Sequence, residues 1–412
     1  MKFSKVQISW LLYDPAASAY AMIVRTVMTP ILLSTCAAGI CSESEITSAW
    51  SLTASFAGIA AGAVSVFFGP MVDARRKKVQ MVGIFTAIGV LSCIACILPD
   101  MLGRPSGVSG ILAVSFIGLC SFMVSNSFYD SLLISVADAD DRDRLSSIGY
   151  ALGYAGALVS FLICLIILKI WGDGVFFRAS FLLTAAWWLV GSIPLLLNVR
   201  EQKTTAGAKG VRIAETIRFV FTHRNILIFL TAYFLYIDGV GTILLAATPL
   251  AAGLKISTKH IMFTILALQL FGLPFTILYG RLANRFSAKK MIYAAIGIYV
   301  TIAVLVTVMS VCRDLRIRQI LFFICAGLIG TSQGGIQSLS RSVFSRIIPP
   351  ERAAELFAVY NIFGKFTTIV GPFLIAAATM LWDKAELGIT MMIVPFCLGA
   401  FMLSKVKTAD ER

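Results

Sequence analysis

The stretch GPMVDARRKK at 69–78 joins two long apolar runs, 47–69 and 79–98. Each run is long enough to cross a membrane, because a spanning helix needs roughly 20 apolar residues. Clustered Lys and Arg beside such runs are typical of the cytoplasmic ends of spans. The stretch therefore predicts two membrane helices joined by a short cytoplasmic turn, with close helix approach at Gly69 and a capping role for Asp73 at a neighbouring helix.

A similar stretch, GRLANRFSAKK at 280–290, follows a second apolar run of the same kind. It also opens with Gly and ends in Lys, and it has Asn284 where the first copy has Asp73. Each copy comes after the second span of a set of six. This spacing predicts two related halves of six spans each.

The rest of the chain agrees with an all-α integral membrane protein. Of its 412 residues, 58% are hydrophobic and 14% are charged, whereas soluble proteins carry about 25% charged residues. We predict twelve spans, in two pseudo-symmetric six-helix bundles, at 8–37, 47–69, 79–98, 108–135, 146–170, 176–197, 225–252, 257–280, 289–311, 318–345, 353–380 and 386–405.

One connection is long and polar and separates the two sets of six spans. The domains expected from this are an N-terminal bundle at 1–199, a cytoplasmic linker at 200–224 and a C-terminal bundle at 225–412. Within the linker, apolar and charged residues of 211–221 alternate with helical spacing. We expect an amphipathic helix there that lies on the bilayer.

The basic excess of the chain indicates topology. The net charge is +14, and most of the 35 Lys and Arg residues fall on one side of the predicted spans. By the positive-inside rule, that side is the cytoplasm and holds both termini. The distribution, together with the lack of any nucleic-acid-binding motif, argues against a nucleic acid as partner.

The sequence offers no chemistry typical of an enzyme. It contains two His residues and no phosphate-binding G-x-x-x-x-G-K-[ST] pattern. The nine Cys residues lie mostly in apolar runs, where Cys acts as a small hydrophobe. We expect neither catalytic residues nor a metal site nor a cofactor, and a disulfide between Cys36 and Cys41 is an open alternative.

The two cytoplasmic stretches resemble the loop signature G-x-x-x-D-[RK]-x-G-[RK]-[RK] of the major facilitator superfamily. The matching residues are Gly69, Asp73, Lys77 and Lys78 in the first copy, and Gly280 and Arg285 in the second. Ala74 and Arg76 depart from the signature, and Asn284 replaces its acid. The resemblance implies the twelve-helix facilitator fold, with solute crossing by alternating access between two halves.

A narrower resemblance covers most of the chain. It is similar to the "unknown major facilitator" family, which includes the fungal autophagy-related vacuolar amino-acid effluxers. The stretches that carry it are WLLYDPAASAY (10–20), FYDSLL (128–133), SSIGYALGYAGALV (146–159), YFLYIDGVGTI (233–243), GGIQSLSRSVFSRIIPP (334–350) and AELFAVYNIFGKFTTIVGP (354–372). Pro15, Ala17 and Arg25 depart from the family pattern, so the resemblance implies a shared scaffold and leaves the solute open.

Polar residues inside the spans are the predicted transport site, because an ionisable group there costs at least ~2.5 kcal/mol. In span one, Asp14, Ser18, Ala21 and Arg25 share one face of an α-helix. Asp238 lies at mid-depth in span seven, and spans one and seven line the central cavity in the facilitator fold. We therefore predict that Asp238 and Arg25 face each other there. The remaining predicted residues are Asn126, Asp130, Tyr150, Tyr154, Gln333, Gln337, Asn361 and Lys365.

Alternative roles remain open for several of these residues. Asp14 and Asp238 can instead cap or bridge helices and never titrate, and Tyr150 and Tyr154 can serve packing. Arg341, near the inner end of span ten, is predicted as a gate or a headgroup contact. The predicted gating residues are Gly69, Asp73, Lys77, Lys78, Gly280, Asn284, Arg285 and Arg341.

Together these observations predict a secondary transporter, monomeric, in a cell membrane, and a bacterial inner membrane given the short loops. Its partners would be a small polar solute, an amino acid by the resemblance, a coupling proton or other ion, and membrane lipids. A lipid, lysolipid or drug exporter on the same fold is one alternative. A non-transporting membrane receptor or scaffold is the other.

Overall fold

A computed structural model describes residues 3–36, 42–101, 107–201, 213–256, 258–365 and 385–408. Within these ranges the regular structure is entirely helical. Ten helical segments are long and apolar enough to span a membrane. The eleventh predicted span, 353–380, falls partly on 366–384, outside the described residues, whereas the twelfth, 386–405, coincides with the shorter apolar helix Gly388–Ser404.

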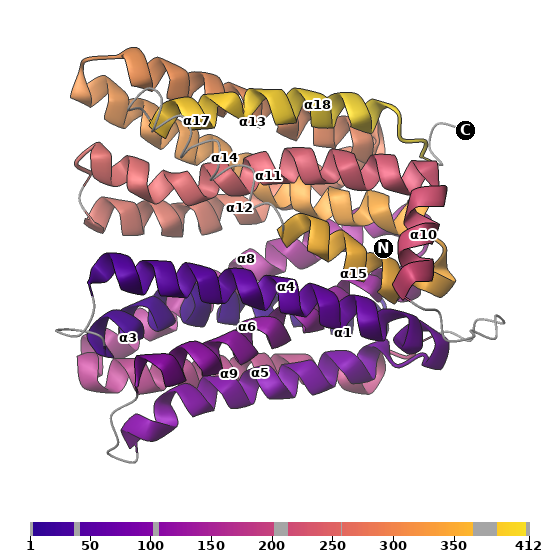
Figure 1. Cartoon of the computed structure of the whole chain (residues 1–412), viewed down its shortest axis with the longest axis horizontal. Helices are drawn as coiled ribbons and strands as arrows, with labels where there is room; N and C mark the ends of the chain where they lie inside the picture. Colours follow the sequence, from indigo (N-terminus) through magenta and orange to yellow (C-terminus); the bar gives the residue numbers. More distant parts are fainter. Residues whose placement is uncertain are drawn as a thin grey trace. The chain divides into compact units, whose positions relative to one another are not determined.

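The first half of the chain contains the helices α1 (Lys5–Leu11), α2 (Tyr13–Ala19), the π-helix η1 (Tyr20–Met28), α3 (Thr29–Cys36), α4 (Glu43–Arg75), α5 (Lys78–Met101), α6 (Val108–Ser131), α7 (Leu133–Val136), α8 (Arg142–Trp171) and α9 (Asp173–Asn198). In Figure 1, α4, α5, α6 and α9 lie side by side. α5 packs against α6 and α9, and α4 packs against α6.

The second half contains α10 (Ile213–Thr222), α11 (Arg224–Gly253), α12 (Thr258–Phe286), α13 (Ala288–Val311), α14 (Leu315–Ile347), α15 (Ala353–Lys365), α17 (Ala385–Met391) and α18 (Ile393–Ser404). α14 packs against α12 and α13, and α11 packs against α18. The short helix α10 occupies the part of the linker where an amphipathic helix is predicted.

The described residues group by their contacts into two units. The first consists of Met1–Asp138, Leu152–Ile213 and Pro350–Val359, and the second of Ala139–Ala151, Ala214–Pro349 and Tyr360–Arg412. The beginning of α8 thus belongs to the second unit, and the beginning of α15 belongs to the first. The six-plus-six division at the central linker remains a prediction, since the contact-based units exchange these two segments.

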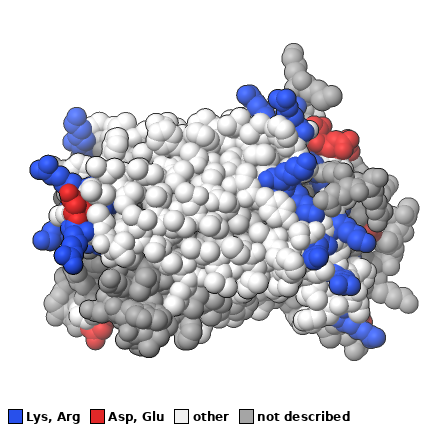
Figure 2. Space-filling view, turned by 90° about the horizontal axis from the view of Figure 1, so that it is seen from above, with Lys and Arg blue, Asp and Glu red and all other residues white. Residues whose placement is uncertain are grey.

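The distribution of charge fits a chain that spans a bilayer. On the face drawn in Figure 2, Lys, Arg, Asp and Glu lie near the two ends, and the stretch between them shows none of these residues. Many large apolar side chains on the helices are exposed, among them Phe67, Leu91 and Phe263 at 64%, 64% and 71%. Side chains of this kind are stable in contact with acyl chains.

Three details of the helices differ from the predicted spans. The stretches 69–78 and 280–290 are mostly helix rather than turn, because α4 continues to Arg75 and α12 to Phe286. Span one is interrupted at Leu12, where Pro15 lacks the N–H that would bond to the Leu11 carbonyl. From Tyr20 to Met28 the same span is a π-helix, in which the backbone bonds run from i to i+5.

Candidate functional site

In the first unit, the carboxylate of Asp14 has a defined partner from another span. The Tyr129 hydroxyl on α6 donates to Asp14 Oδ2 at 2.8 Å. Asp14 is half-buried, whereas Tyr129 is 1% exposed. The interruption of span one near Pro15 places Asp14 at the start of α2, and Trp187 on α9 donates from Nε1 to the Pro15 carbonyl at 3.1 Å. The acid is therefore held in place by two neighbouring helices.

Aromatic packing fixes the position of Tyr129. Its ring stacks on that of Trp10, with centroids 4.6 Å apart, and lies equally close to the ring of Tyr13. Trp10 also donates from Nε1 to the Tyr129 carbonyl at 3.3 Å, and the Tyr13 hydroxyl lies 3.3 Å from Thr86 Oγ1. With Trp10 and Tyr13 fully buried, Tyr129 has little freedom to turn away from Asp14.

The other predicted residues of the first unit lie on the same group of helices. Ser18 is half-buried and packs close to Gly153 of α8, where an added Cβ would come within 2.8 Å of its hydroxyl. Asn126 and Asp130 are one turn apart on α6, and Asp130 is 8% exposed. Tyr154 of α8 is half-buried. These placements leave their predicted roles untested.

Arg25 lies in the π-helix, which changes its predicted register. Because the backbone bonds of η1 run from i to i+5, Arg25 does not follow Ser18 with regular α-helical spacing. The shared face of Asp14, Ser18, Ala21 and Arg25 remains a prediction. Arg25 and Asp238 belong to different units, so their pairing remains a prediction.

In the second unit, Asp238 lies inside α11 and is 1% exposed. α11 has 30 residues, from Arg224 to Gly253, and Asp238 lies midway along it. Next to it, Gly239 packs against the ring of Phe396 on α18, and an added Cβ would come within 2.5 Å of that ring. Asp238 is therefore buried inside the protein at the level where α11 packs closely against α18.

Polar residues of α14 form a row on its inner half. Gln333 and Gln337 are half-buried, and Arg341 is 1% exposed. Ser340 shares a hydrogen bond of 2.6 Å with the Tyr236 hydroxyl on α11. Arg341 is thus inside the protein and not in contact with lipid headgroups, which removes that alternative.

The Arg341 guanidinium joins α14 to the beginning of α8. It donates from Nε to Ser146 Oγ at 2.9 Å and from Nη2 to the Ser146 carbonyl at 3.0 Å, and it lies 4.4 Å from the ring centre of Tyr150. The Ser146 hydroxyl in turn donates to the Ser338 carbonyl at 2.7 Å. A planar group with several fixed donors suits this forked contact better than an ammonium would.

One helical turn nearer the end, two further arginines join the same helices. Arg346 forms an ion pair with the buried Asp143 at 2.7 Å and donates to the Ala139 carbonyl at 3.0 Å. Arg142 donates to the Ser345 carbonyl at 2.8 Å. Together with Arg341, these contacts form a continuous polar connection between α8 and α14.

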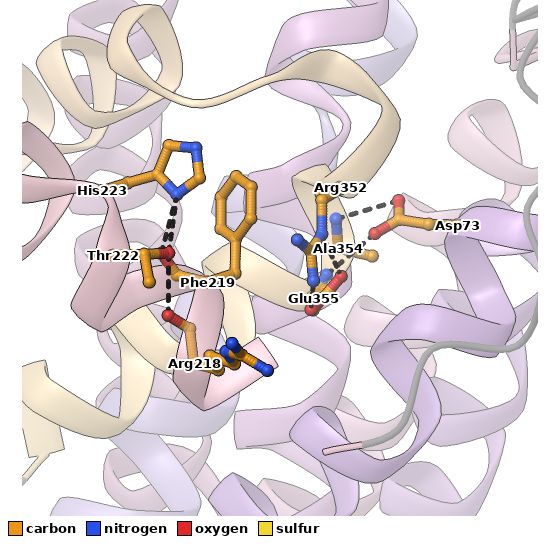
Figure 3. Close-up of polar contacts among 8 residues, drawn as sticks. All are labelled: Asp73, Arg218, Phe219, Thr222, His223, Arg352, Ala354 and Glu355. Atoms are coloured by element: carbon orange, nitrogen blue, oxygen red, sulfur yellow. Dashed lines mark hydrogen bonds and ion pairs between the residues drawn. The ribbon is translucent and has the colours of Figure 1, made fainter. Parts of the chain in front are cut away.

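In the first unit, α4 meets the beginning of α15 at the predicted signature. Asp73 accepts from the backbone N–H groups of Ala354 and Glu355 at 3.0 and 2.9 Å, and Lys78 lies 3.0 Å from Asp73 Oδ1. Figure 3 shows the carboxylate aimed at the first turn of α15, with Arg352 and Glu355 paired beside it. An added Cβ on Gly69 would come within 2.7 Å of Glu355 Cα. The predicted close approach and the predicted helix cap are both confirmed.

The second copy repeats the close approach without the cap. An added Cβ on Gly280 of α12 would come within 2.5 Å of Ser147 Cβ on α8. Asn284 and Arg285 are exposed, and Arg285 lies over the ring of Phe286. In the first copy, Lys77 directly follows Arg76, whose backbone has a left-handed conformation at the end of α4. Asp143, in the first turn of α8, pairs with Arg346 of α14.

Two predicted residues lie on α15, and for one of them only the backbone is described. Asn361 is half-buried. Lys365 is the last residue of α15. Tyr360, next to Asn361, stacks on Tyr233 at 4.2 Å and on Phe344 at 4.9 Å. This aromatic group joins α15 to α11 and α14.

Several residues of this site are not among those predicted. Tyr129, Ser146 and Glu355 each contact a predicted residue more than 100 positions away, and Asp143 pairs with Arg346, which is also not among the predicted residues. Glu201, after α9, accepts from the Val79 N–H at 3.3 Å and so caps α5. Their signal in the sequence is weak, because a Ser or Tyr within an apolar run does not reveal its partner.

Comparisons with known proteins agree on the family and the fold. The family described as "Vacuole effluxer Atg22 like" matches residues 4–411. The uncharacterized MFS-type transporter YxiO of Bacillus subtilis is 32% identical over 98% of the chain and 95% of its own length. Autophagy-related protein 22-1 of Penicillium rubens is 26% identical over 57% of the chain and 44% of its own length.

Solved structures support the facilitator fold. The MFS proton:xylose symporter XylE, bound to 6-bromo-6-deoxy-D-glucose, matches with a TM-score of 0.77 at 16% identity over 98% of the chain and 96% of its own. A bacterial homologue of the iron transporter ferroportin, in an outward-facing state, matches with a TM-score of 0.72 at 13% identity over 99% of both chains. At these identities the likeness concerns the fold alone.

Proposed function

Because the chain belongs to the Atg22-like family of the major facilitator superfamily and is thus a secondary transporter, we propose that it moves a small polar solute, an amino acid or a close analogue, by alternating access coupled to protons. The observation that carries the proposal is Asp238, which is 1% exposed in the middle of the membrane helix α11. A carboxylate at that depth is costly and typical of ion pathways.

Asp14 supports the same proposal from the first unit. It is half-buried, and the hydroxyl of Tyr129 donates to it through a side-chain bond that a solute could share or replace. Each unit therefore contributes an acid from a membrane helix. With Asp130, Arg25 and Lys365, these residues give the spans both signs of charge, which suits a zwitterion better than a lipophilic cation.

The first experiment identifies the solute. Proteoliposomes that contain the purified protein are loaded with one pool of unlabelled compounds at a time: amino acids, organic acids, nucleosides, sugars or lysolipids. We then measure the counterflow of a labelled member of the pool. A dye trapped inside the vesicles reports the internal pH at the same time. We expect counterflow with the amino-acid pool and a pH change on adding it outside.

Each other outcome decides against part of the proposal. Counterflow with lysolipids alone would favour a lipid exporter on the same fold. Counterflow without a pH change would remove proton coupling. Wild-type protein that binds a pool in a thermal-shift assay but shows no counterflow would favour a receptor. Asp314→Asn, which changes an exposed helix-capping acid outside the spans, is the matched control for acid-to-amide variants.

A further inference from the structure

The helix α10 buries one face and leaves an apolar pair exposed on another. Thr216 and Val220 are 0% and 4% exposed, whereas Ile217 and Phe221 are 50% and 67% exposed. Residues four apart lie on the same side of a helix. Ile217 and Phe221 therefore form one apolar strip on the outside of the protein.

The connection between α10 and α11 fixes where this strip lies. Only His223 separates the two helices, and its backbone N–H donates to the Phe219 carbonyl at 3.0 Å while its own carbonyl accepts from Ile226 at 2.9 Å. The His223 ring stacks on Phe219 with centroids 3.7 Å apart, as Figure 3 shows. In Figure 1, α10 runs across the direction of α11. Since α11 spans the membrane, α10 lies along its surface.

The C-terminal segment is tied to the same place. The Asn225 side chain donates to the Lys407 carbonyl at 2.9 Å and accepts from the Lys407 N–H at 2.8 Å. Lys289 at the start of α13 donates to the Val406 carbonyl at 2.8 Å and is 7% exposed. These bonds hold the residues after α18 beside the first residues of α11.

The result is a group of exposed cations around exposed apolar side chains. Arg218 and Arg224 are exposed on α10 and α11, and Lys405 and Lys407 are exposed on the tail. Lys405 Nζ lies 5.2 Å from the ring centre of Phe401, itself 57% exposed. Among the described residues of α10, Glu215 is the acid, and it too is exposed.

We propose that this surface, formed by Ile217, Arg218, Phe221, Arg224, Lys405 and Lys407, binds the headgroup of an anionic phospholipid. The apolar strip inserts at the boundary between the lipid headgroups and the acyl chains, and the four cations surround the phosphate diester. In an anionic lipid this phosphate leaves a net negative charge, whereas the amine of a zwitterionic headgroup neutralises it. The proposal is independent of the transported solute. The bonds between Asn225 and Lys407 would place Lys405 and Lys407 where they can contact the lipid.

Titration of the full-length protein in neutral detergent with POPG or POPC tests this proposal. Hydrogen exchange of the peptides covering 213–222 and 399–408 is followed at each lipid concentration, which gives a local apparent affinity. We expect POPG to slow exchange in both peptides at concentrations where POPC does not. Arg224→Gln with Lys407→Gln should weaken the POPG effect by about fivefold per cation.

Two further variants separate lipid binding from general charge and from misfolding. Arg313→Gln with Arg316→Gln removes the same charge elsewhere on the chain and should leave the POPG effect unchanged. Asn225→Ala keeps all four cations but removes the two bonds to Lys407, while Lys289 still holds Val406, and it should weaken the POPG effect at 399–408 more than that at 213–222. Equal protection by POPC and POPG in the wild type would overturn the proposal, as would an unchanged POPG affinity in the Arg224 and Lys407 double variant.

Discussion

At the scale of single residues, Asp73 shows how much one buried acid can hold together. It is bonded to two backbone N–H groups at the start of α15 and to the Lys78 ammonium, and the side chains of this ion pair are 4% and 7% exposed. The Lys78 ammonium and the two N–H groups offset part of the cost of taking this carboxylate out of water. An Asn at this position keeps one oxygen for Lys78 and the Ala354 N–H, but it leaves the Glu355 N–H without its acceptor and the Lys78 charge without its counter-ion.

Asp73→Asn is therefore predicted to lower the free energy of unfolding by about 2 to 4 kcal/mol. Thermal unfolding in detergent, followed by intrinsic fluorescence, would show a melting temperature lower by several degrees. Asn caps a helix about as well as Asp does. The free energy of unfolding of Asp314→Asn should therefore stay within about 0.5 kcal/mol of the wild-type value. Equal stability of the two variants would show that the Asp73 cap contributes little.

Glu201 gives a pH-dependent prediction outside the spans. Burial raises the pKa of its carboxyl above the ordinary value of 4.5, and the Lys78 charge together with hydrogen bonds from Val79 and Lys78 offsets this only in part. The folded protein then binds this proton more tightly than the unfolded chain does. The stability that Glu201 contributes is complete below pH 4.5 and is lost as the pH rises through the higher, folded value.

Glu201→Gln removes this loss, because the amide cannot ionise. The melting temperature of the variant relative to the wild type should therefore rise between pH 4 and pH 7. The comparison is made by scanning both proteins in the same buffers. A relative melting temperature that falls over this range would mean that attraction to Lys78 outweighs burial.

At the scale of helices, close backbone contact at Gly69 joins α4 to α15. The nearest atoms to an added Cβ are the Cα and N of Glu355, at 2.7 and 3.1 Å, and these backbone atoms cannot turn aside as a side chain can. A similarly close approach occurs at Gly280, where an added Cβ would come within 2.5 Å of Ser147 Cβ on α8. The two glycines of the repeated stretch thus serve the same packing role in the two units.

Gly69→Ala is predicted to destabilise the protein by about 1 to 3 kcal/mol, because α4 and α15 must separate. Gly110→Ala is the matched control, since an added Cβ there meets no atom within 4 Å. That variant should be neutral or more stable by up to ~1 kcal/mol through helix propensity. Thermal unfolding of both proteins checks this, and equal melting temperatures would contradict the close contact.

The helices were largely predictable from the sequence, but their irregularities were not. Apolar length alone indicates a span, and it located the ten long helices to within a few residues, apart from the inner ends of α4 and α12. The π-helix at Tyr20–Met28 changes the register of Arg25 without any mark in composition. The bond between Asp14 and Tyr129 joins residues 115 positions apart, so no periodicity reveals it.

At the scale of the whole molecule, each contact-based unit contains an acid inside a membrane helix. Asp14 belongs to the first unit and Asp238 to the second. The beginnings of α8 and α15 belong to the unit opposite the rest of their helices, and buried polar contacts at Ser146 and Glu355 hold them there.

The role of Asp238 in coupling predicts a particular pattern of loss. Asn cannot release or bind a proton but has nearly the same size, so solute exchange at equilibrium should continue in Asp238→Asn. Net uptake driven by a pH gradient should fall at least tenfold, because the step that depends on the proton is missing. Asp314→Asn should retain both activities.

The most direct measurement compares these two activities in the same proteoliposomes, with the solute identified by counterflow. For wild-type protein and Asp238→Asn, the ratio of gradient-driven uptake to counterflow is determined with an imposed pH gradient. We expect the variant to keep its counterflow and to lose its gradient-driven uptake. A variant whose ratio equals that of the wild type would contradict the coupling role of the buried acid in α11.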